Sequence, residues 1–282
     1  ERLSTCLMPI FFLLMIGLAA YSLLLPGSEA GLAYLFQFSW STVTPQAILN
    51  AMGFTFFSLS LGAGVLVTYG AYVNKSTRLP AAAMWVAILA LQAAILAGLV
   101  IMPAVFAYGL EPDAGPGLVF ITLPMIFAQL SGGSVVAVIF YFCLFVAALT
   151  SAVSLLEVAV AFLQNECRFS RRAAVFLCFA ALFILGSVSA LSFGPWSDCL
   201  IFGRSIFDFL DYVCTNFLMT INGLAVAFVV GWKAWPKAMK ELSTCSPENG
   251  VVTKGTLSAI GFGLRWLAPL MVLASCWQGL EA

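Results

Sequence analysis

The sequence predicts an all-α integral membrane protein with seven spanning helices. Of its 282 residues, 62% are hydrophobic and only 9% are charged, whereas a soluble domain is about 45–50% apolar and about 25% charged. So much apolar surface exceeds what one water-facing core can bury. The 12 basic and 12 acidic residues balance and histidine is absent, which argues against nucleic-acid binding and against imidazole chemistry.

Seven apolar runs have the length of about 20 residues that a bilayer crossing needs. We predict one transmembrane domain over residues 1–282, with spans at residues 6–25, 47–73, 80–108, 135–164, 173–191, 205–232 and 256–277. Short cytoplasmic connections concentrate lysine and arginine. Ten of the twelve basic residues lie in connections on one side of the membrane: Arg2, Lys75, Arg78, Arg168, Arg171, Arg172, Lys233, Lys237, Lys240 and Lys254. Arg204 lies on the opposite side, and Arg265 lies within the last span. We expect the inner (plasma) membrane, a cytoplasmic N-terminus and an external C-terminus.

The outer connection at residues 109–133 carries no basic residue but has an apolar stretch at 118–130. The stretch is short for a span and is bounded by proline and glycine. It favours a re-entrant or surface-lying helical lid, and an ordinary loop with an apolar patch is the alternative.

The middle of the second span predicts a broken helix. Two serines and two glycines lie in the run from Phe57 to Gly64, and they weaken helix continuity between Ser58 and Gly64. A break would turn backbone carbonyls, amides and half-helix dipoles towards a bound ion or substrate. Close helix packing through small residues is the alternative explanation.

The fourth span gathers oxygen donors on one helical face. Ala147, Thr150, Ser151 and Ser154 follow each other at helical spacing, and hydroxyls beside carbonyls suit a small hard cation. Glu157 continues this face. Because an unpaired ionised carboxyl costs about 2.5–3.5 kcal/mol within a span, we expect Glu157 to be neutral or hydrogen-bonded, with direct substrate contact as the alternative.

Two carboxylates, Asp208 and Asp211, begin the sixth span. For Asp208 a role at the helix end is favoured, because acids stabilise the positive end of the helix dipole. Asp211 lies one turn deeper, where gating and helix-end roles are both open. An enzyme is not expected, since the sequence has no Ser-His triad, no paired metal ligands and no glycine-rich phosphate loop followed by lysine.

Five segments together resemble the bacterial branch of the neurotransmitter:sodium symporter family: FFSLSLGAG, TYGAYV, FITLPMIFAQLSGG, FVAALTSAVSLLEVAVAFL and FDFLDYVCTNFL. The resemblance implies the leucine-transporter-like fold of inverted repeats and broken helices, which is described for this family. It also implies sodium-coupled symport of an amino acid, with no organic cofactor. The seven spans match family helices five to eleven, so the chain from Glu1 is expected to lack the first four helices. A non-transporting truncated fragment, or a split subunit, is the alternative.

The resemblance also assigns roles to individual residues. Ala147, Thr150 and Ser151 match a sodium site, and Ser58 matches a ligand of another. Asp211 matches the acid of an outer gate, and residues 109–133 match the outer lid. The substrate-pocket positions are Phe57, Ser58, Ser60, Ala63, Ser151 and Leu155, with Phe57 as the aromatic lid.

Two departures from the family pattern affect these expectations. Ile88-Leu89-Ala90 stands where the family offers a polar ligand to the sodium site of Ser58, so that site is in doubt. The small Ala63 leaves room for a large aliphatic or aromatic amino acid. The expected partners are that amino acid, the lipid bilayer and the missing N-terminal helices, and no nucleic acid.

Overall fold

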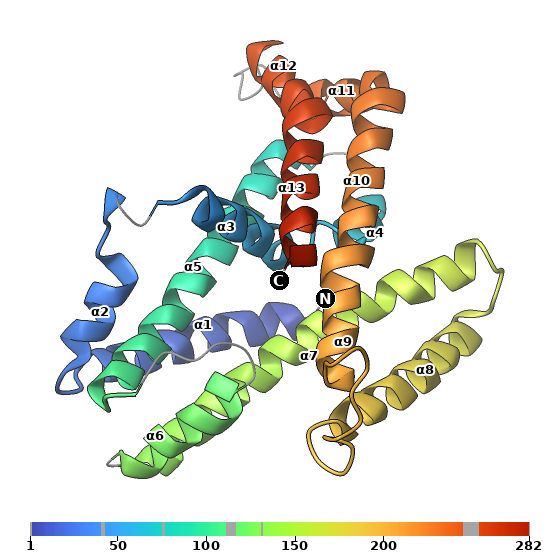
Figure 1. The fold of residues 1–282 in the computed structure, drawn as a ribbon. Helices are drawn as coiled ribbons and strands as arrows, with labels where there is room; N and C mark the ends of the chain where they lie inside the picture. The colour runs from blue at the N-terminus through green and yellow to red at the C-terminus, as the bar shows by residue number, and fades with distance from the viewer. Residues whose placement is uncertain are drawn as a thin grey trace. The chain divides into compact units, whose positions relative to one another are not determined.

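The computed structural model describes residues 2–40, 43–74, 77–110, 117–130, 132–244 and 254–281, and helices make up its long elements (Figure 1). Within these residues the β-structure is one isolated bridge between Ile201 and Arg204. The all-α class predicted from composition is therefore confirmed. Parts of three predictions fall outside the described residues. They are the chain start at Glu1, the orientation at Lys75, and the lid at residues 111–116 and 131.

Six helical stretches among the described residues are long and apolar enough to cross a membrane: Thr5–Leu23, Leu79–Ala107, Gly133–Asn165, Arg171–Leu191, Ile206–Lys233 and Leu257–Ala274. The remaining predicted span, at 47–73, is interrupted. Helix α3 (Pro45–Ser58) ends where the serines and glycines begin, and α4 (Val65–Tyr72) follows them. The predicted break at Ser58–Gly64 is therefore confirmed.

The chain divides into two compact units. The first comprises Glu1–Thr42 and Ala87–Val153. Its helices are α1 (Arg2–Leu23), α2 (Ser28–Phe36), the second part of α5 (Leu79–Ala107), the π-helical turn η2 (Leu118–Thr122), α6 (Leu123–Gln129) and the first part of α7 (Gly133–Asn165).

One hydrophobic core holds this first unit together. Leu18 of α1, Val105 of α5, Ile126 of α6 and Phe140 of α7 all contribute buried side chains to it. The Tyr141 hydroxyl donates to the Val119 carbonyl over 2.8 Å and joins α7 to η2. The apolar stretch of the predicted outer lid is therefore helical and is packed by its apolar side chains.

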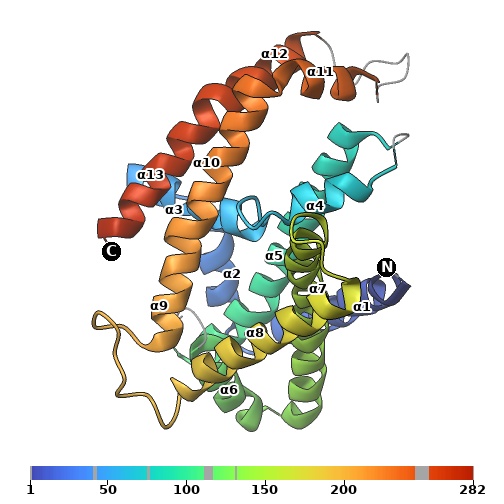
Figure 2. The same ribbon diagram turned by 90° about the vertical axis from the view of Figure 1, so that its right-hand side faces the viewer.

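The second unit comprises Val43–Val86 and Ser154–Ala282. After α3, α4 and the end of α7 come α8 (Arg171–Leu191), α9 (Ile206–Tyr212), η3 (Val213–Met219), α10 (Thr220–Phe228), η4 (Val229–Lys233), α11 (Trp235–Thr244), α12 (Lys254–Phe262), η5 (Gly263–Leu267) and α13 (Ala268–Glu281). Helices α10 and α13 lie side by side in Figures 1 and 2 and are in contact.

Local sequence explains where these helices start. Thr44 caps α3 by accepting from the Ala47 amide at 3.1 Å, and proline occupies the first turn, where its missing N–H costs nothing. Ser170 caps α8 in the same way. A serine or threonine cap satisfies one of the amides that a helix leaves without an internal partner.

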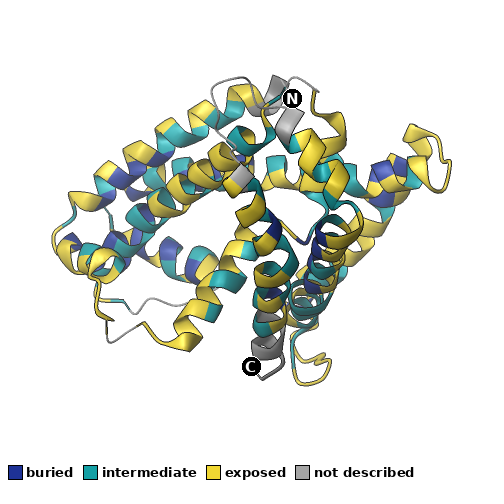
Figure 3. Ribbon diagram, turned by 90° about the horizontal axis from the view of Figure 1, so that it is seen from above, coloured by how far each residue is buried: buried dark blue, intermediate teal, exposed yellow. Residues whose placement is uncertain are grey.

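Many large apolar side chains are exposed, and Figure 3 shows exposed residues along the helices of both units. Val138 and Phe176, for example, are 70% and 73% exposed. In water such surfaces would be unfavourable, but hydrocarbon is as apolar as these side chains. The exposure fits a multi-pass membrane protein.

Candidate functional site

The break between α3 and α4 is the first element of the candidate site. Its backbone turns tightly: the Ser60 amide donates to the Phe57 carbonyl at 2.9 Å, and the Ala63 amide to the Ser60 carbonyl at 3.2 Å. Ser60 and Gly64 adopt positive φ values of 52° and 76°, which are uncommon for residues other than glycine. The C-terminal end of α3 and the N-terminal end of α4 both face this turn, so opposite partial charges converge there.

The turn is attached to the adjacent span at the junction of η3 and α10. The Asn222 side-chain amide donates to the Gly62 carbonyl over 2.7 Å. Gly62 is buried, and a Cβ at this position would overlap the carbonyl oxygen of Met219. Glycine is therefore required by the close approach of two backbones. The broken helix and the close packing, which the sequence offered as alternatives, occur together here.

The first half of the broken helix packs on the same span. The Phe56 ring lies directly on Gly223, where a Cβ would overlap it, and α3 also contacts α13. An apolar cavity of about 470 Å³ lies among α3, the break, α10 and α13, lined by Ile48, Ala51, Met52, Thr55, Phe56, Leu61, Thr220, Ala268, Met271 and Val272. These contacts hold α3 and the break against α10 and α13.

The second half of the broken helix is attached to α7 instead. The hydroxyls of Tyr69 and Ser154 are 3.2 Å apart, and the Tyr72 hydroxyl donates to Glu157 Oε1 at 3.4 Å. The two tyrosines thus join α4 to the face of α7 that carries Ser154 and Glu157.

Glu157 is both hydrogen-bonded and ion-paired. Its Oε2 accepts from the Arg171 guanidinium at 2.9 Å, and its Oε1 from the same group at 3.2 Å. Arg171 also donates to Gln164 at 3.3 Å. The expectation of a hydrogen bond is confirmed. The sequence did not identify Arg171 as the partner of Glu157, because the two residues are 14 positions apart and are brought together by the turn from α7 to α8.

The predicted sodium ligands of α7 lie in the first unit. The Thr150 hydroxyl donates to the carbonyls of Ala147 and Val146 at 2.9 and 3.1 Å, while Ser151 is exposed one position later. The carbonyl and the hydroxyl are thus adjacent, as a shared ion would require.

The predicted substrate positions Phe57, Ser58, Ser60 and Ala63 lie in the second unit, at the end of α3 and in the break. Leu155 lies in the same unit on α7. Phe57 is 53% exposed and Leu155 is 50% exposed. Both side chains are therefore accessible to a ligand.

The two acids of the sixth span have different environments. The Ser205 hydroxyl accepts from the Asp208 amide at 3.1 Å and donates to the Asp208 carboxylate at 2.6 Å, so the expected helix-end role of Asp208 is confirmed. Asp211 is exposed one turn on, and its carbonyl accepts from Thr215. Nearby, the Arg204 guanidinium lies 4.3 Å from the centre of the Tyr212 ring.

A family profile described as the sodium:neurotransmitter symporter family matches residues 3–258. The chain belongs to this family. It is 38% identical over 275 residues to an uncharacterized sodium-dependent transporter of Haemophilus influenzae, covering 97% of this chain and 59% of that protein. It is 34% identical to another in Bacillus subtilis, covering 97% and 60%. The chain therefore spans about three fifths of the length of these symporter relatives.

A solved structure supports the fold. The crystal structure of MhsT in complex with L-phenylalanine superimposes with a TM-score of 0.84 at 41% sequence identity, covering 97% of this chain and 61% of that one. The leucine-transporter-like architecture, which the resemblance to the symporter family implied, is thereby confirmed.

The sequence did not identify the residues that hold the broken helix in place. Asn222 and Gly223 form a polar and small pair in the middle of a span, a combination that marks close helix contacts in membranes. That signal was present, but one sequence does not show which helix the pair contacts. Arg171 was assigned only to a connection, because its partner Glu157 lies in a different helix.

The close approach at Gly62 predicts that alanine destabilises the protein at Gly62 but not at Gly70. We expect Gly62→Ala to lower the melting temperature of the purified protein, because overpacking against a backbone costs about 1–3 kcal/mol. Gly70→Ala is the matched control, since a Cβ there has no atom within 4 Å. Equal melting temperatures for the two variants would contradict the contact with Met219.

The environment of Glu157 predicts tolerance of the isosteric amide. Glu157→Gln keeps an oxygen that accepts from Tyr72 and Arg171, so we expect membrane expression close to that of the wild type. Glu157→Leu removes every acceptor and should reduce the amount of folded protein. Expression can be measured by fluorescence-detected size exclusion, and a gross loss for the glutamine variant would rule out this account.

Proposed function

We propose that this chain forms part of a secondary transporter that couples amino acid uptake to the flow of sodium ions, without covalent chemistry. The observation that carries the proposal is the break at residues 59–64, where two half-helices end beside serine and glycine backbone. Such broken helices let backbone groups coordinate ions and polar substrate groups at membrane depth. Membership of the sodium:neurotransmitter symporter family supports the same function.

The proposed substrate is a large apolar amino acid, aromatic or aliphatic. Its proposed contacts are Phe57, Ser58, Ser60, Ala63, Ser151 and Leu155. The exposed Phe57 ring and Leu155 side chain supply apolar surface, and the small side chain of Ala63 takes up little room in the proposed pocket. The structural relative at 41% identity was solved with L-phenylalanine, which fits a substrate of this size.

The proposed sodium site uses the Ala147 carbonyl and the hydroxyls of Thr150 and Ser151. These are hard oxygen donors, which small hard cations prefer, and the first two are 2.9 Å apart. Ser58 is a proposed ligand of another sodium ion. The apolar Ile88, Leu89 and Ala90 offer no side-chain oxygen to that ion, so a cycle with a single sodium ion is the alternative.

The remaining site elements control access. Asp211 is the proposed acid of an outer gate, and residues 109–133 are the proposed outer lid. The ten basic residues on one side favour a cytoplasmic N-terminus in the inner membrane. The chain does not span about two fifths of the length of its relatives, and we propose that transport also needs the helices of that part. The complete transporter would alternate access by a shift between two populations of conformations.

The sodium site predicts how hydroxyl removal changes transport. In proteoliposomes holding the transporter that contains this chain, L-phenylalanine uptake should require sodium and should fail in potassium. The double variant Thr150→Ala with Ser151→Ala should raise the sodium concentration for half-maximal uptake about tenfold or more, because two ligands are lost.

Thr55→Ala is the matched control, since the Thr55 hydroxyl also donates to a backbone carbonyl of its own helix, that of Ala51 at 2.7 Å. We expect it to leave the sodium dependence unchanged. Unaltered sodium dependence in the double variant would remove Thr150 and Ser151 from the site. Uptake that proceeds equally in potassium would refute sodium coupling itself.

A further inference from the structure

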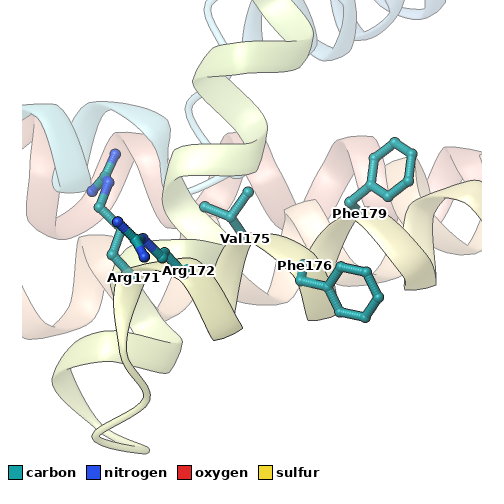
Figure 4. A pocket seen from close by; sticks show the side chains of 5 residues that line it. All are labelled: Arg171, Arg172, Val175, Phe176 and Phe179. Carbon is teal, nitrogen blue, oxygen red and sulfur yellow. The ribbon is translucent and has the colours of Figure 1, made fainter.

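The start of α8 carries a basic and aromatic surface that the proposed transport function does not use. Figure 4 shows Arg171 and Arg172 beside Val175, Phe176 and Phe179, which follow one another along the same helix. Together they line an open hollow of about 600 Å³. We call these five residues the α8 surface.

Apart from Arg171, the α8 surface faces away from the packing of α8 on α7. Helix α8 packs against α7 through the buried Ala174 and Cys178, which meet Val160. Phe176 and Phe179, by contrast, are 73% and 60% exposed. The buried and exposed residues thus occupy different faces of one helix, and nothing described in the second unit covers the exposed face.

The two arginines are not equivalent. Arg171 is engaged by Glu157 and Gln164, whereas Arg172 is exposed at the edge of the hollow. A guanidinium group presents several donors in a fixed fork that matches phosphate geometry. Arg172 therefore offers a cationic group with phosphate-binding geometry at the end of a membrane span.

The apolar residues continue from this cation towards the middle of the membrane. The Phe179 ring stacks on that of Phe183, with centroids 6.0 Å apart. At about 1.5 Å per residue, the stripe from Arg172 to Phe183 is about 16 Å long. One leaflet contributes about 15 Å of the hydrocarbon core, so an acyl chain can lie along the whole stripe.

We propose that the α8 surface binds an anionic phospholipid, with the headgroup phosphate on Arg172 and one acyl chain along Val175, Phe176 and Phe179. Charge complementarity selects the anionic headgroup, because basic residues at the end of a span attract acidic lipids. The nearby Arg168 adds positive charge, whereas Glu157 and Glu166 oppose it. The selectivity therefore depends on Arg172, whose guanidinium forms no ion pair with a carboxylate among the described residues, in contrast to that of Arg171.

The test is native mass spectrometry of the delipidated protein in neutral detergent, titrated with dioleoyl phosphatidylglycerol or dioleoyl phosphatidylcholine. We expect the first phosphatidylglycerol to bind more tightly than phosphatidylcholine. Arg172→Ala should weaken phosphatidylglycerol binding about fivefold, and Arg172→Lys should restore part of it. Phe176→Ala should weaken both lipids. The melting temperature of each variant verifies that it is folded.

Arg78→Ala is the matched control, since Arg78 is another exposed arginine, just before α5. It should leave phosphatidylglycerol binding unchanged. Equal affinity for the two lipids, or equal losses in the Arg78 and Arg172 variants, would overturn the proposal. It would also be overturned if Arg172→Ala and Phe176→Ala changed only the fraction of dimer, since the surface would then be an interface between two copies.

Discussion

The close backbone contact between the broken helix and the junction of η3 and α10 sets the geometry on which the rest of the site depends. Gly62 approaches Met219 so closely that no side chain fits between them, and Asn222 binds the Gly62 carbonyl. A carbonyl released from a helix at membrane depth must find a donor, because water is excluded there. Asn222 provides that donor, and the turn can persist without unfolding either half-helix.

The two halves of the broken helix are held by different neighbouring helices. Helix α3 and the break are held by α10 and α13, whereas Tyr69 and Tyr72 of α4 are held by α7. The two halves therefore belong to different sets of contacts, joined by a turn with two positive φ angles. The ligand that we propose at the turn would contact the ends of both halves and bias their relative orientation. The proposed alternating-access cycle requires such a bias.

The sequence alone predicted most of the fold and the position of the break, because both depend on local composition. Apolar run length identified the spans, and the serines and glycines between Ser58 and Gly64 identified the interruption. The partners were not predictable in the same way. Asn222 lies 160 residues from Gly62, and Arg171 lies one helix beyond Glu157. Which residues meet across helices depends on packing, which a single sequence does not encode in any local pattern.

The most direct test of the central claim is hydrogen–deuterium exchange of the proposed transporter in lipid nanodiscs. If the break is where ion and substrate bind, sodium with L-phenylalanine should slow exchange of the amides at residues 59–66, relative to potassium with L-phenylalanine. Amides in the middle of α1 should exchange equally in both conditions. Identical exchange at residues 59–66 with sodium and with potassium would contradict the assignment of the break as the binding site.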